Sequence, residues 1–444
     1  MPRRRTQIPV NVYLNNRLVG RLSRESSGAI DFTYDRSWLD WDHALPVSLS
    51  LPLREDRYIG AAVAAVFENL LPDSDALRKR VAERVGATGT DAYSLLAAIG
   101  RDCVGALQFL PDAASPDDIA QGTGKIEGQP VDEEKIGRIF SNLTRSPLGL
   151  NEDDAFRITV AGAQEKTALL RYKGRWLKPI GTTPTTHILK PQIGQLPNGI
   201  NLSNSVENEF YCLQLMKAFG LSVNEARIEN FVGKKVLVIE RFDRRWARDG
   251  QLLRLPQEDC CQALSVPPSL KYQNQGGPGI PDIVGLLKGS DQPEADLLAF
   301  FKAQIVFWLI GATDGHAKNV SIFLTPGNRF RLTPFYDVLT AQPSFDDHLI
   351  QRKQMKLAMA IGDKNRYRIE DITGRHFIQT GAKARMAKRL TLQAISDIRE
   401  ATDDALKSVE TQLPKDFPRS IHESVGTATR ERARRLELSA EGTV

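Results

Sequence analysis

The sequence predicts an α+β fold of two lobes, with an additional β-rich subdomain at the N-terminus and an all-helical C-terminal lobe. Apolar and polar residues alternate with period two early in the chain, whereas helical spacing dominates its last third. Between these regions, the apolar strand 236–239 opens into the charged stretch 240–246, as expected for a connector between lobes. We expect the boundaries 1–112 for the subdomain, 113–150 for a linker and short helix, 151–243 for the N-terminal lobe and 244–444 for the helical lobe.

Composition narrows the class of protein. The net charge of +5 and pI near 8.9 permit contact with nucleic acid or an acidic partner without demonstrating either. Four cysteines without a C-x-x-C pair argue against a zinc site or a disulfide framework, which favours the cytoplasm. The basic start is followed by a strand pattern instead of an apolar signal core, and the most apolar run, 297–312, is shorter than a membrane span. We therefore expect no membrane association.

The N-terminal elements follow from local patterns. Asn15 and Asn16 predict a turn between two short strands, and the alternation at 47–51 predicts a half-buried strand. Residues 75–85 predict a helix after a proline break. The stretch 112–134, rich in Asp, Gly, Pro and Ser, predicts a linker.

The second region begins with a predicted hairpin. Residues 156–160 favour a strand, 161–164 a tight turn of small residues and 166–170 the returning strand. Small side chains allow backbone N–H groups to approach an anion, so this hairpin could cover nucleotide phosphates. An ordinary β-turn is the competing interpretation, because the stretch is not G-x-G-x-x-G.

Lys190 ends the next predicted strand, 185–190, and could neutralise phosphate charge there, although a solvated strand end is the alternative. The helix 204–219 follows, with Asn204 and Glu207 as a cap-like pair and Glu209 as a candidate partner of Lys190. The connector 240–246 then offers backbone groups to adenine.

The strongest chemical signal follows the apolar helix 297–310. Asp314 and Asn319 lie five residues apart, as in the kinase catalytic loop H-R-D-x-x-x-x-N. A hairpin of strands 320–324 and 329–332 would return Asp337 to the vicinity of Asn319, which gives two oxygen ligands for Mg²⁺. Asp and Asn also form simple local turns. The complete order of elements nevertheless favours a two-lobed protein-kinase-like fold with Asp314 as the catalytic base.

Two basic clusters lie in the C-terminal region, and they suit either DNA phosphates or ordinary amphipathic helix surfaces. They comprise Lys383, Arg385, Lys388 and Arg389, and then Arg430, Arg432, Arg434 and Arg435.

Taken together, these motifs resemble the HipA toxin family of bacterial serine/threonine kinases over nearly the whole chain. The stretches that carry the resemblance are 67–74, 99–106, 160–166, 240–246, 255–259, 276–280, 312–319 and 334–337.

The resemblance implies ATP and Mg²⁺ as cofactors, with Asp314 as the base and Asn319 and Asp337 as metal ligands. It implies autophosphorylation at Thr159, where the family has serine, and DNA contact through Lys383 and Arg385. The implied ATP-binding residues are Ala161, Gly162, Ala163, Gln164, Glu165, Lys166, Lys190, Glu240, Arg241, Phe242, His316, Ala317, Lys318, Asn319, Tyr336 and Asp337.

The resemblance also implies a biological role. The expected toxin transfers the ATP γ-phosphate to a protein, glutamyl-tRNA synthetase in the family, and to itself, which inhibits translation and causes growth arrest and persistence. Its expected partner is a HipB-like helix-turn-helix antitoxin dimer, with which it binds operator DNA as a corepressor at the nucleoid. Two alternatives remain: a DNA-bound corepressor with incidental or lost catalysis, and a small-molecule phosphotransferase.

Overall fold

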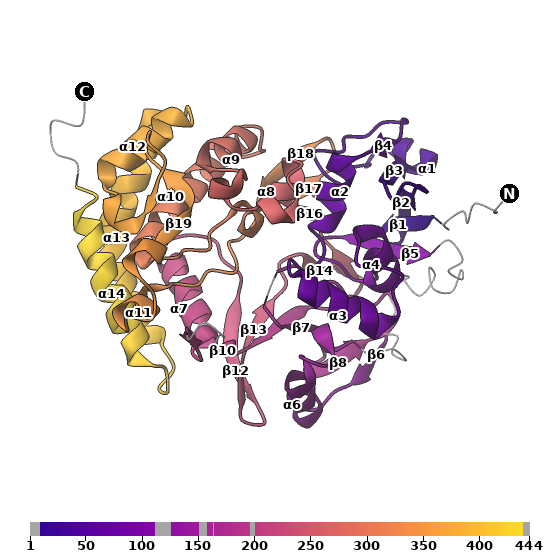
Figure 1. The fold of residues 1–444 in the computed structure, drawn as a ribbon, viewed down its shortest axis with the longest axis horizontal. Coiled ribbons are helices and arrows are strands. Elements are labelled where there is room, and N and C mark those ends of the chain that lie inside the picture. The colour runs from indigo at the N-terminus through magenta and orange to yellow at the C-terminus, as the bar shows by residue number, and fades with distance from the viewer. Residues whose placement is uncertain (1–8, 112–125, 151–157, 163, 196–199, 438–444) are drawn as a thin grey trace. The chain divides into compact units, whose positions relative to one another are not determined.

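The computed structural model describes residues 9–111, 126–150, 158–162, 164–195 and 200–437. The chain divides into two units, each assembled from separate stretches of sequence (Figure 1). Unit 1 contains Met1–Pro191, Glu229–Ser269 and Phe323–Arg329. Unit 2 contains Gln192–Ile228, Leu270–Ile322 and Phe330–Val444. The predicted subdomain and most of the predicted N-terminal lobe thus fall in unit 1.

The first sheet of unit 1 is antiparallel, with strand order β4-β3-β2-β1-β5. Asn15 and Asn16 have φ values of 44° and 70°, the left-handed pair that closes a tight hairpin, so the predicted turn is confirmed. The strands are β1 (Val10–Leu14), β2 (Arg17–Arg24), β3 (Ile30–Tyr34), β4 (Tyr58–Ile59) and β5 (Leu107–Pro111).

The strand predicted at 47–51 is wrong, because this stretch forms bends and turns. The hydroxyl groups of Ser48 and Ser50 both donate to the backbone carbonyl of Gln262, at 3.3 and 2.8 Å. The backbone N–H of Val47 donates to the Tyr34 hydroxyl at 2.9 Å. Hydrogen bonds that involve side chains therefore take the place of the strand pairing that the alternating apolar and polar residues predicted.

Short helices complete this part of unit 1. The helix predicted at 75–85 is confirmed: Ser74 caps its first turn by accepting from the Leu77 N–H, and Gly86, with φ 65°, ends it. The helices are α1 (Arg36–Leu39), α2 (Ala61–Glu68), α3 (Asp75–Val85), α4 (Ala92–Ile99) and α8 (Cys260–Ala263).

The second sheet has the order β12-β13-β9-β7-β8-β6, and helix α6 (Glu133–Asn142) packs on it through Ile136 and Phe140. Lys190 lies opposite Leu237 in the pairing of β9 with β13. The strands are β6 (Gly128–Pro130), β7 (Thr167–Tyr172), β8 (Arg175–Pro179), β9 (His187–Pro191), β12 (Ala226–Phe231) and β13 (Lys234–Glu240).

The hairpin predicted from 156 to 170 does not form as expected. Its returning strand exists as β7, but Ile158–Val160 is not a strand, and residues 156 and 157 lie outside the described chain. The Thr159 N–H donates to the backbone carbonyl of Asp102 at 3.0 Å, so this stretch pairs with a loop, while β7 pairs with β8 and β9.

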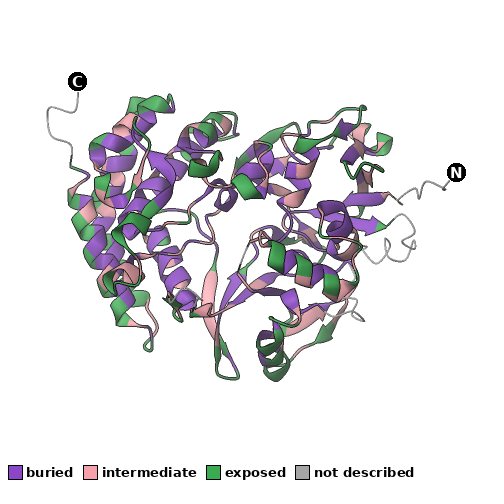
Figure 2. Ribbon diagram, in the orientation of Figure 1, coloured by how far each residue is buried: buried purple, intermediate pink, exposed green. Residues whose placement is uncertain are grey.

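Helices dominate unit 2, and α10, α12, α13 and α14 pack side by side (Figure 1). Helix α10 is buried over almost its whole length, as the predicted apolar helix required (Figure 2). The helices are α7 (Ser205–Ala218), α9 (Ile280–Leu287), α10 (Pro293–Ile310), α11 (Gln342–Asp346), α12 (Gly374–Lys383), α13 (Lys388–Gln412) and α14 (Arg419–Arg434).

The predicted cap of α7 is wrong in detail, because the Asn204 side chain makes no capping hydrogen bond. Instead the Gln192 side-chain oxygen accepts from the Val206 N–H at 2.9 Å and from the Ser205 hydroxyl at 3.2 Å. Unit 2 also contains the hairpin of β19 (Lys356–Ile361) and β20 (Arg366–Arg368).

The hairpin predicted after the Asp314 loop is formed by β17 (Ser321–Thr325) and β18 (Arg329–Leu332). The remaining short strands are β10 (Gly194–Gln195), β11 (Asn201–Leu202), β14 (Arg244–Trp246), β15 (Leu252–Arg254) and β16 (Gln257–Asp259). Within the described ranges, no helix has both the length and the apolarity that a membrane crossing requires.

Candidate active site

The Asp314 loop is fixed by the end of α10. Gly311, with φ 73°, terminates the helix, and the chain then runs through Asp314 into a short 3₁₀ turn at Ala317–Asn319. Gly315 lies against the buried Phe307 ring, where a Cβ atom would stand 2.6 Å from Cδ2. Glycine is therefore needed for this close approach, which holds the loop against the helix that precedes it.

Asn319 joins the two acidic segments of the site. Its side-chain amide donates to the backbone carbonyl of Asp314 at 2.9 Å and to that of Asp337 at 3.5 Å. Asp337 has φ 58°, an uncommon conformation for a residue other than glycine. The structure thus brings Asp337 beside Asn319, as the hairpin predicted. Because the amide nitrogen faces these carbonyls, the Asn319 Oδ1 atom is the acceptor that remains for a hard cation.

The Asp314 carboxylate is half exposed, and two aromatic side chains frame it. The Tyr272 hydroxyl donates to Asp314 Oδ1, and His316 Nε2 lies 3.8 Å from the same oxygen. The Tyr272 and His316 rings meet edge to face with centroids 5.0 Å apart. Sequence reasoning missed Tyr272, which lies 42 residues before Asp314.

Tyr336 stabilises the 3₁₀ turn that follows Asp314. Its hydroxyl donates to the Lys318 carbonyl at 2.9 Å and lies 2.6 Å from the Ser321 hydroxyl. Ala317 and Lys318 are buried. The structure therefore brings together Asp314, His316, Asn319, Tyr336 and Asp337 within unit 2.

The predicted phosphate loop lies in unit 1. Gly162 has φ 105°. The Lys166 amine donates to the Ala161 carbonyl, so this lysine hydrogen-bonds within the loop. The Gln164 amide donates to the Pro191 carbonyl at 3.1 Å, next to buried Lys190. Glu165 pairs with Arg80 at 3.1 Å. Ala163 lies outside the described residues.

The three connector residues that were predicted to line the adenine site differ in their exposure and contacts. Glu240 is exposed at the end of β13. The Arg241 N–H donates to the Thr186 carbonyl at 2.9 Å, and its guanidinium is buried. Phe242 packs edge to face on Phe323 with centroids 5.6 Å apart. The side chain of Arg241 thus serves the interior of unit 1.

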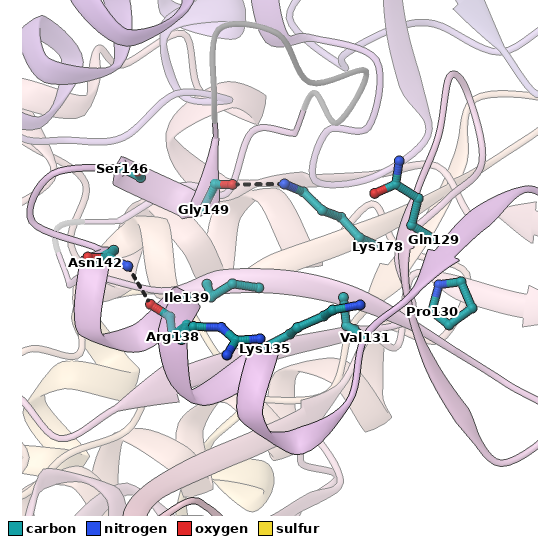
Figure 3. A pocket seen from close by; sticks show the side chains of 10 residues that line it. All are labelled: Gln129, Pro130, Val131, Lys135, Arg138, Ile139, Asn142, Ser146, Gly149 and Lys178. Atoms are coloured by element: carbon teal, nitrogen blue, oxygen red, sulfur yellow. Dashed lines mark hydrogen bonds between the residues drawn. The ribbon is translucent and has the colours of Figure 1, made fainter.

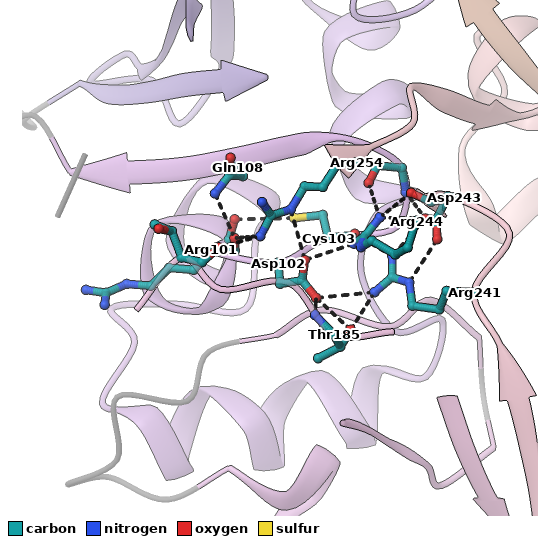
Figure 4. Close-up of polar contacts among 12 residues, drawn as sticks. Arg101, Asp102, Cys103, Gln108, Thr185, Arg241, Asp243, Arg244 and Arg254 are labelled. Atoms are coloured by element: carbon teal, nitrogen blue, oxygen red, sulfur yellow. Dashed lines mark hydrogen bonds and ion pairs between the residues drawn. The ribbon is translucent and has the colours of Figure 1, made fainter. Parts of the chain in front are cut away.

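That interior holds a buried ionic network that the sequence did not reveal (Figure 4). The Asp102 carboxylate accepts from Arg244 at 2.8 Å and from Arg254 at 3.1 Å, and it lies 3.3 Å from Arg241. Asp243 pairs with Arg241 at 2.8 Å and accepts from the Gly105 N–H at 2.7 Å. The network joins the 99–106 loop to the connector. The only sequence signal was charge inside two of the stretches that carry the family resemblance.

Burial and charge oppose each other in this network. Burial alone would raise the pKa of the Asp102 carboxyl, but the guanidinium groups of Arg244, Arg254 and Arg241 outweigh it and hold that pKa below its usual value. Burial lowers the pKa of Arg254 to about 10 despite the nearby Asp102 charge. Asp102 is therefore a buried, ionised group that depends on its partners.

The residues expected to be modified or to meet DNA differ in exposure. Thr159 is fully buried, whereas Lys383 and Arg385 are exposed at the end of α12, where the Lys383 amine donates to Asn365 at 2.6 Å. The second basic cluster is partly structural, since Arg432 donates to the Leu309 carbonyl at 2.7 Å. That arginine is therefore held between α14 and α10, a role that neither interpretation of the cluster anticipated.

A cavity of about 500 Å³ opens elsewhere in unit 1, between α6, β6 and β8 (Figure 3). Lys135, Arg138 and Lys178 line it, and the Lys178 amine donates to the Gly149 carbonyl at 3.3 Å. None of the predicted ATP-binding residues contributes to its wall. In the part of the chain that the structure describes, no three His, Cys, Asp or Glu side chains gather as a metal site.

Comparison with known proteins identifies the class. The family model of the HipA-like C-terminal domain matches residues 158–406, and that of the HipA N-terminal domain matches residues 10–110. One chain of the solved complex of HipA, HipB and operator DNA from Shewanella oneidensis MR-1 superposes on this chain with a TM-score of 0.78 at 24% identity. The match covers 96% of this chain and 97% of that chain. This match confirms the predicted α+β fold.

Sequence relatives extend over most of the chain. Y4mE of Sinorhizobium fredii is 34% identical over 439 residues, 97% of this chain and 99% of that protein. The serine/threonine-protein kinase toxin HipA of Shewanella oneidensis is 28% identical over 374 residues, 80% of this chain and 79% of that protein. The chain belongs to the HipA family, as the motifs predicted.

Proposed function

We propose that this protein is an ATP-dependent serine/threonine protein kinase that acts as the toxin of a toxin–antitoxin pair. The observation that carries the proposal is the Asn319 amide, which ties the backbone of Asp314 to that of Asp337. This arrangement would give phosphoryl transfer the base and the two oxygen ligands that it requires. A relative with the name serine/threonine-protein kinase toxin supports the same function.

Each group then has a role. Asp314, whose carboxylate is half exposed, orients the hydroxyl of the acceptor serine or threonine and takes its proton as the oxygen attacks the γ-phosphorus. The bond between the γ-phosphorus and the bridging oxygen of ATP breaks, and ADP leaves. Asn319 and Asp337 would hold Mg²⁺, which neutralises charge on the phosphates when bound. Lys190 contacts the α- and β-phosphates. The remaining proposed ATP contacts are Ala161, Gly162, Ala163, Gln164, Glu165, Lys166, Glu240, Arg241, Phe242, His316, Ala317, Lys318 and Tyr336.

The network around Arg241 limits how the connector can act. Its guanidinium is held by Asp102 and Asp243, and its N–H is bonded to Thr186. The Arg241 side chain would therefore fix the connector in place and would not contact the nucleotide itself. Adenine would contact the backbone of the connector and the Phe242 ring.

Thr159 is the proposed site of self-phosphorylation. Its side chain is fully buried, so a kinase could reach the hydroxyl only after the 158–162 stretch leaves its place. The hydrogen bond from the Thr159 N–H to Asp102 would then break. A phosphate carries about two negative charges and could not return to that buried position unpaired.

The proposed partners follow from the family. A HipB-like antitoxin dimer would bind the chain, and the complex would contact operator DNA, with exposed Lys383 and Arg385 near the phosphates. A solved relative forms a complex of HipA, HipB and operator DNA. The proposed protein substrate is glutamyl-tRNA synthetase, and the proposed location is the cytoplasm and, with antitoxin, the nucleoid.

Labelled ATP tests the function directly. The purified chain is incubated with labelled ATP and Mg²⁺, alone, with glutamyl-tRNA synthetase, and with a cell extract. Label on the synthetase supports the full proposal, and label on another protein supports a kinase of different target. Label only on a metabolite, or none with operator binding retained, would replace the proposal by a small-molecule phosphotransferase or a corepressor.

Asp314→Ala provides the decisive variant. We expect transfer to be lost while ATP binding, measured by titration calorimetry, is retained, because the carboxylate acts on the acceptor hydroxyl. Asp347→Asn, an exposed carboxylate in unit 2, is the matched control. Equal turnover by Asp314→Ala and the control would exclude Asp314 as the base.

A further inference from the structure

The stretch Leu270–Gly279 contains a glycine-rich motif that the proposed function does not use. Within it, the Tyr272 hydroxyl donates to Asp314 Oδ1. We propose that this stretch is a platform that holds Tyr272 as the positioning residue of Asp314. The proposal rests on the proposed function, since it concerns the base of that reaction.

At one glycine of the platform a side chain would collide with backbone, and at a second it would meet the end of a neighbouring side chain. A Cβ atom on Gly277 would lie 1.9 Å from the Leu270 carbonyl oxygen and 2.9 Å from that of Tyr272. A Cβ atom on Gly279 would lie 2.4 Å from the Gln273 side chain. The backbone on both sides of Tyr272 is thus folded into contact that only glycine permits.

Hydrogen bonds fix the same backbone. The Tyr272 carbonyl accepts from the N–H groups of Gln275 and Gly277, both at 3.0 Å. The Gln273 side-chain oxygen accepts from the Ala360 N–H in β19 at 2.6 Å. The Tyr272 carbonyl and the residue that follows it are therefore anchored, so the backbone from which the Tyr272 ring extends is fixed.

The ring of Tyr272 is also oriented. It meets the buried His316 imidazole edge to face at 5.0 Å, and His316 itself follows Asp314 by two residues. Both contacts to the Asp314 carboxylate are made at Oδ1. The second oxygen, Oδ2, is then directed to accept the hydrogen bond of the substrate hydroxyl. Tyr272 thus selects one orientation of an otherwise half-exposed carboxylate.

Tyr272→Phe removes the hydroxyl and keeps the ring contact with His316. A hydrogen bond to a charged group is worth enough to lower kcat by about tenfold to a hundredfold when it is lost. We expect this loss in kcat with KM for ATP and the calorimetric ATP affinity unchanged, because Tyr272 orients the base and does not hold the nucleotide. Tyr367→Phe in β20 is the matched control and should retain native kcat.

Gly277→Ala tests the platform without changing the side chain of Tyr272 or of Asp314. It should reproduce the loss in kcat at unchanged ATP affinity, because the added methyl group displaces the Leu270 and Tyr272 backbone. Gly285→Ala in α9, where a Cβ atom meets nothing within 4 Å, should behave as native. Urea midpoints of all four variants are compared to separate local displacement from unfolding.

The outcomes are distinct. If the native chain transfers no phosphate to any acceptor, the proposed function fails. If the native chain transfers phosphate and Tyr272→Phe does so at native kcat, the positioning role of Tyr272 fails alone. A change in KM for ATP at native kcat would also overturn it, because that result would make Tyr272 a nucleotide contact.

Discussion

The Asp102 carboxylate forms an ion pair with the Arg244 guanidinium at 2.8 Å, and both side chains are almost fully excluded from solvent. The two residues are 142 positions apart in the chain. Their pairing joins the loop before β5 to the stretch after β13, which the proposed nucleotide site needs in a fixed position. Backbone carbonyls accept further hydrogen bonds from the three arginines of the network, so their positive charges are stabilised on several sides. Arg241 donates to Cys103, Arg244 to Gly105 and Arg254 to Thr182.

Asp102→Asn should destabilise the protein strongly. The variant leaves buried arginines without their shared counter-charge, which typically costs about 3 to 5 kcal/mol. Urea unfolding followed by tryptophan fluorescence measures the change in the free energy of unfolding. Glu55→Gln, which removes one of two exposed carboxylates paired with Arg36, should show no measurable change. A similar midpoint for both variants would show that the network contributes no net stability.

Glu258 should make stability fall with rising pH. Burial raises the pKa of its carboxyl to about 8, although the Leu49 N–H donates to it at 2.8 Å. Between about pH 4.3, the usual glutamate value, and pH 8 the folded state binds the proton more tightly than the unfolded state. The free energy of unfolding therefore contains a term that is present below this window and is lost as pH rises, by up to about 1.4 kcal/mol per pH unit.

Glu258→Gln tests that term, because glutamine keeps an acceptor for the Leu49 N–H and does not titrate. Urea unfolding at pH 5, 6 and 7.5 should give a smaller decline with pH for this variant than for the native chain. The same decline in both proteins would show that Glu258 is already ionised when the protein is folded.

Asp337→Asn should weaken the response of nucleotide binding to Mg²⁺. Removing one carboxylate from a site with two protein ligands raises the Mg²⁺ concentration needed for half-maximal ATP binding by at least about tenfold. Calorimetric titration of ATP at a series of Mg²⁺ concentrations measures this shift. Asp347→Asn should keep the native response, and an unshifted Asp337→Asn curve would remove Asp337 from the metal site.

Gly315→Ala should disturb the Asp314 loop, because the new methyl group would collide with the Phe307 ring. Overpacking of this kind costs about 1 to 3 kcal/mol and displaces backbone. We expect lower kcat and a lower urea midpoint. The double variant Gly315→Ala, Phe307→Leu relieves the collision and should recover part of both losses. Failure of the second substitution to restore either quantity would show that Phe307 is not the cause.

Local signals made some elements predictable from sequence and left others hidden. Helix α3 was predicted correctly because its helical pattern lies within the segment and the proline break lies just before it. Asp337 was placed beside Asn319 because a short hairpin leaves little choice of geometry. The strand at 47–51 was wrong because Ser48 and Ser50 bond to Gln262, more than two hundred residues away. Tyr272 and the Asp102 network were missed for the same reason, since distant pairing leaves no periodic pattern.

The interleaving of the two units along the chain affects how the protein is made. Unit 1 lacks a segment until residue 329 has been synthesised, and α10 of unit 2 packs against α13 and α14, which come last. A nascent chain that stops after β18 would therefore contain every segment of unit 1 together with a long apolar α10 that lacks its packing against α13 and α14. Such a product is prone to aggregate or to be degraded. Premature termination should consequently yield little truncated protein, because the apolar surface of α10 is covered in full only when α13 and α14 have been made.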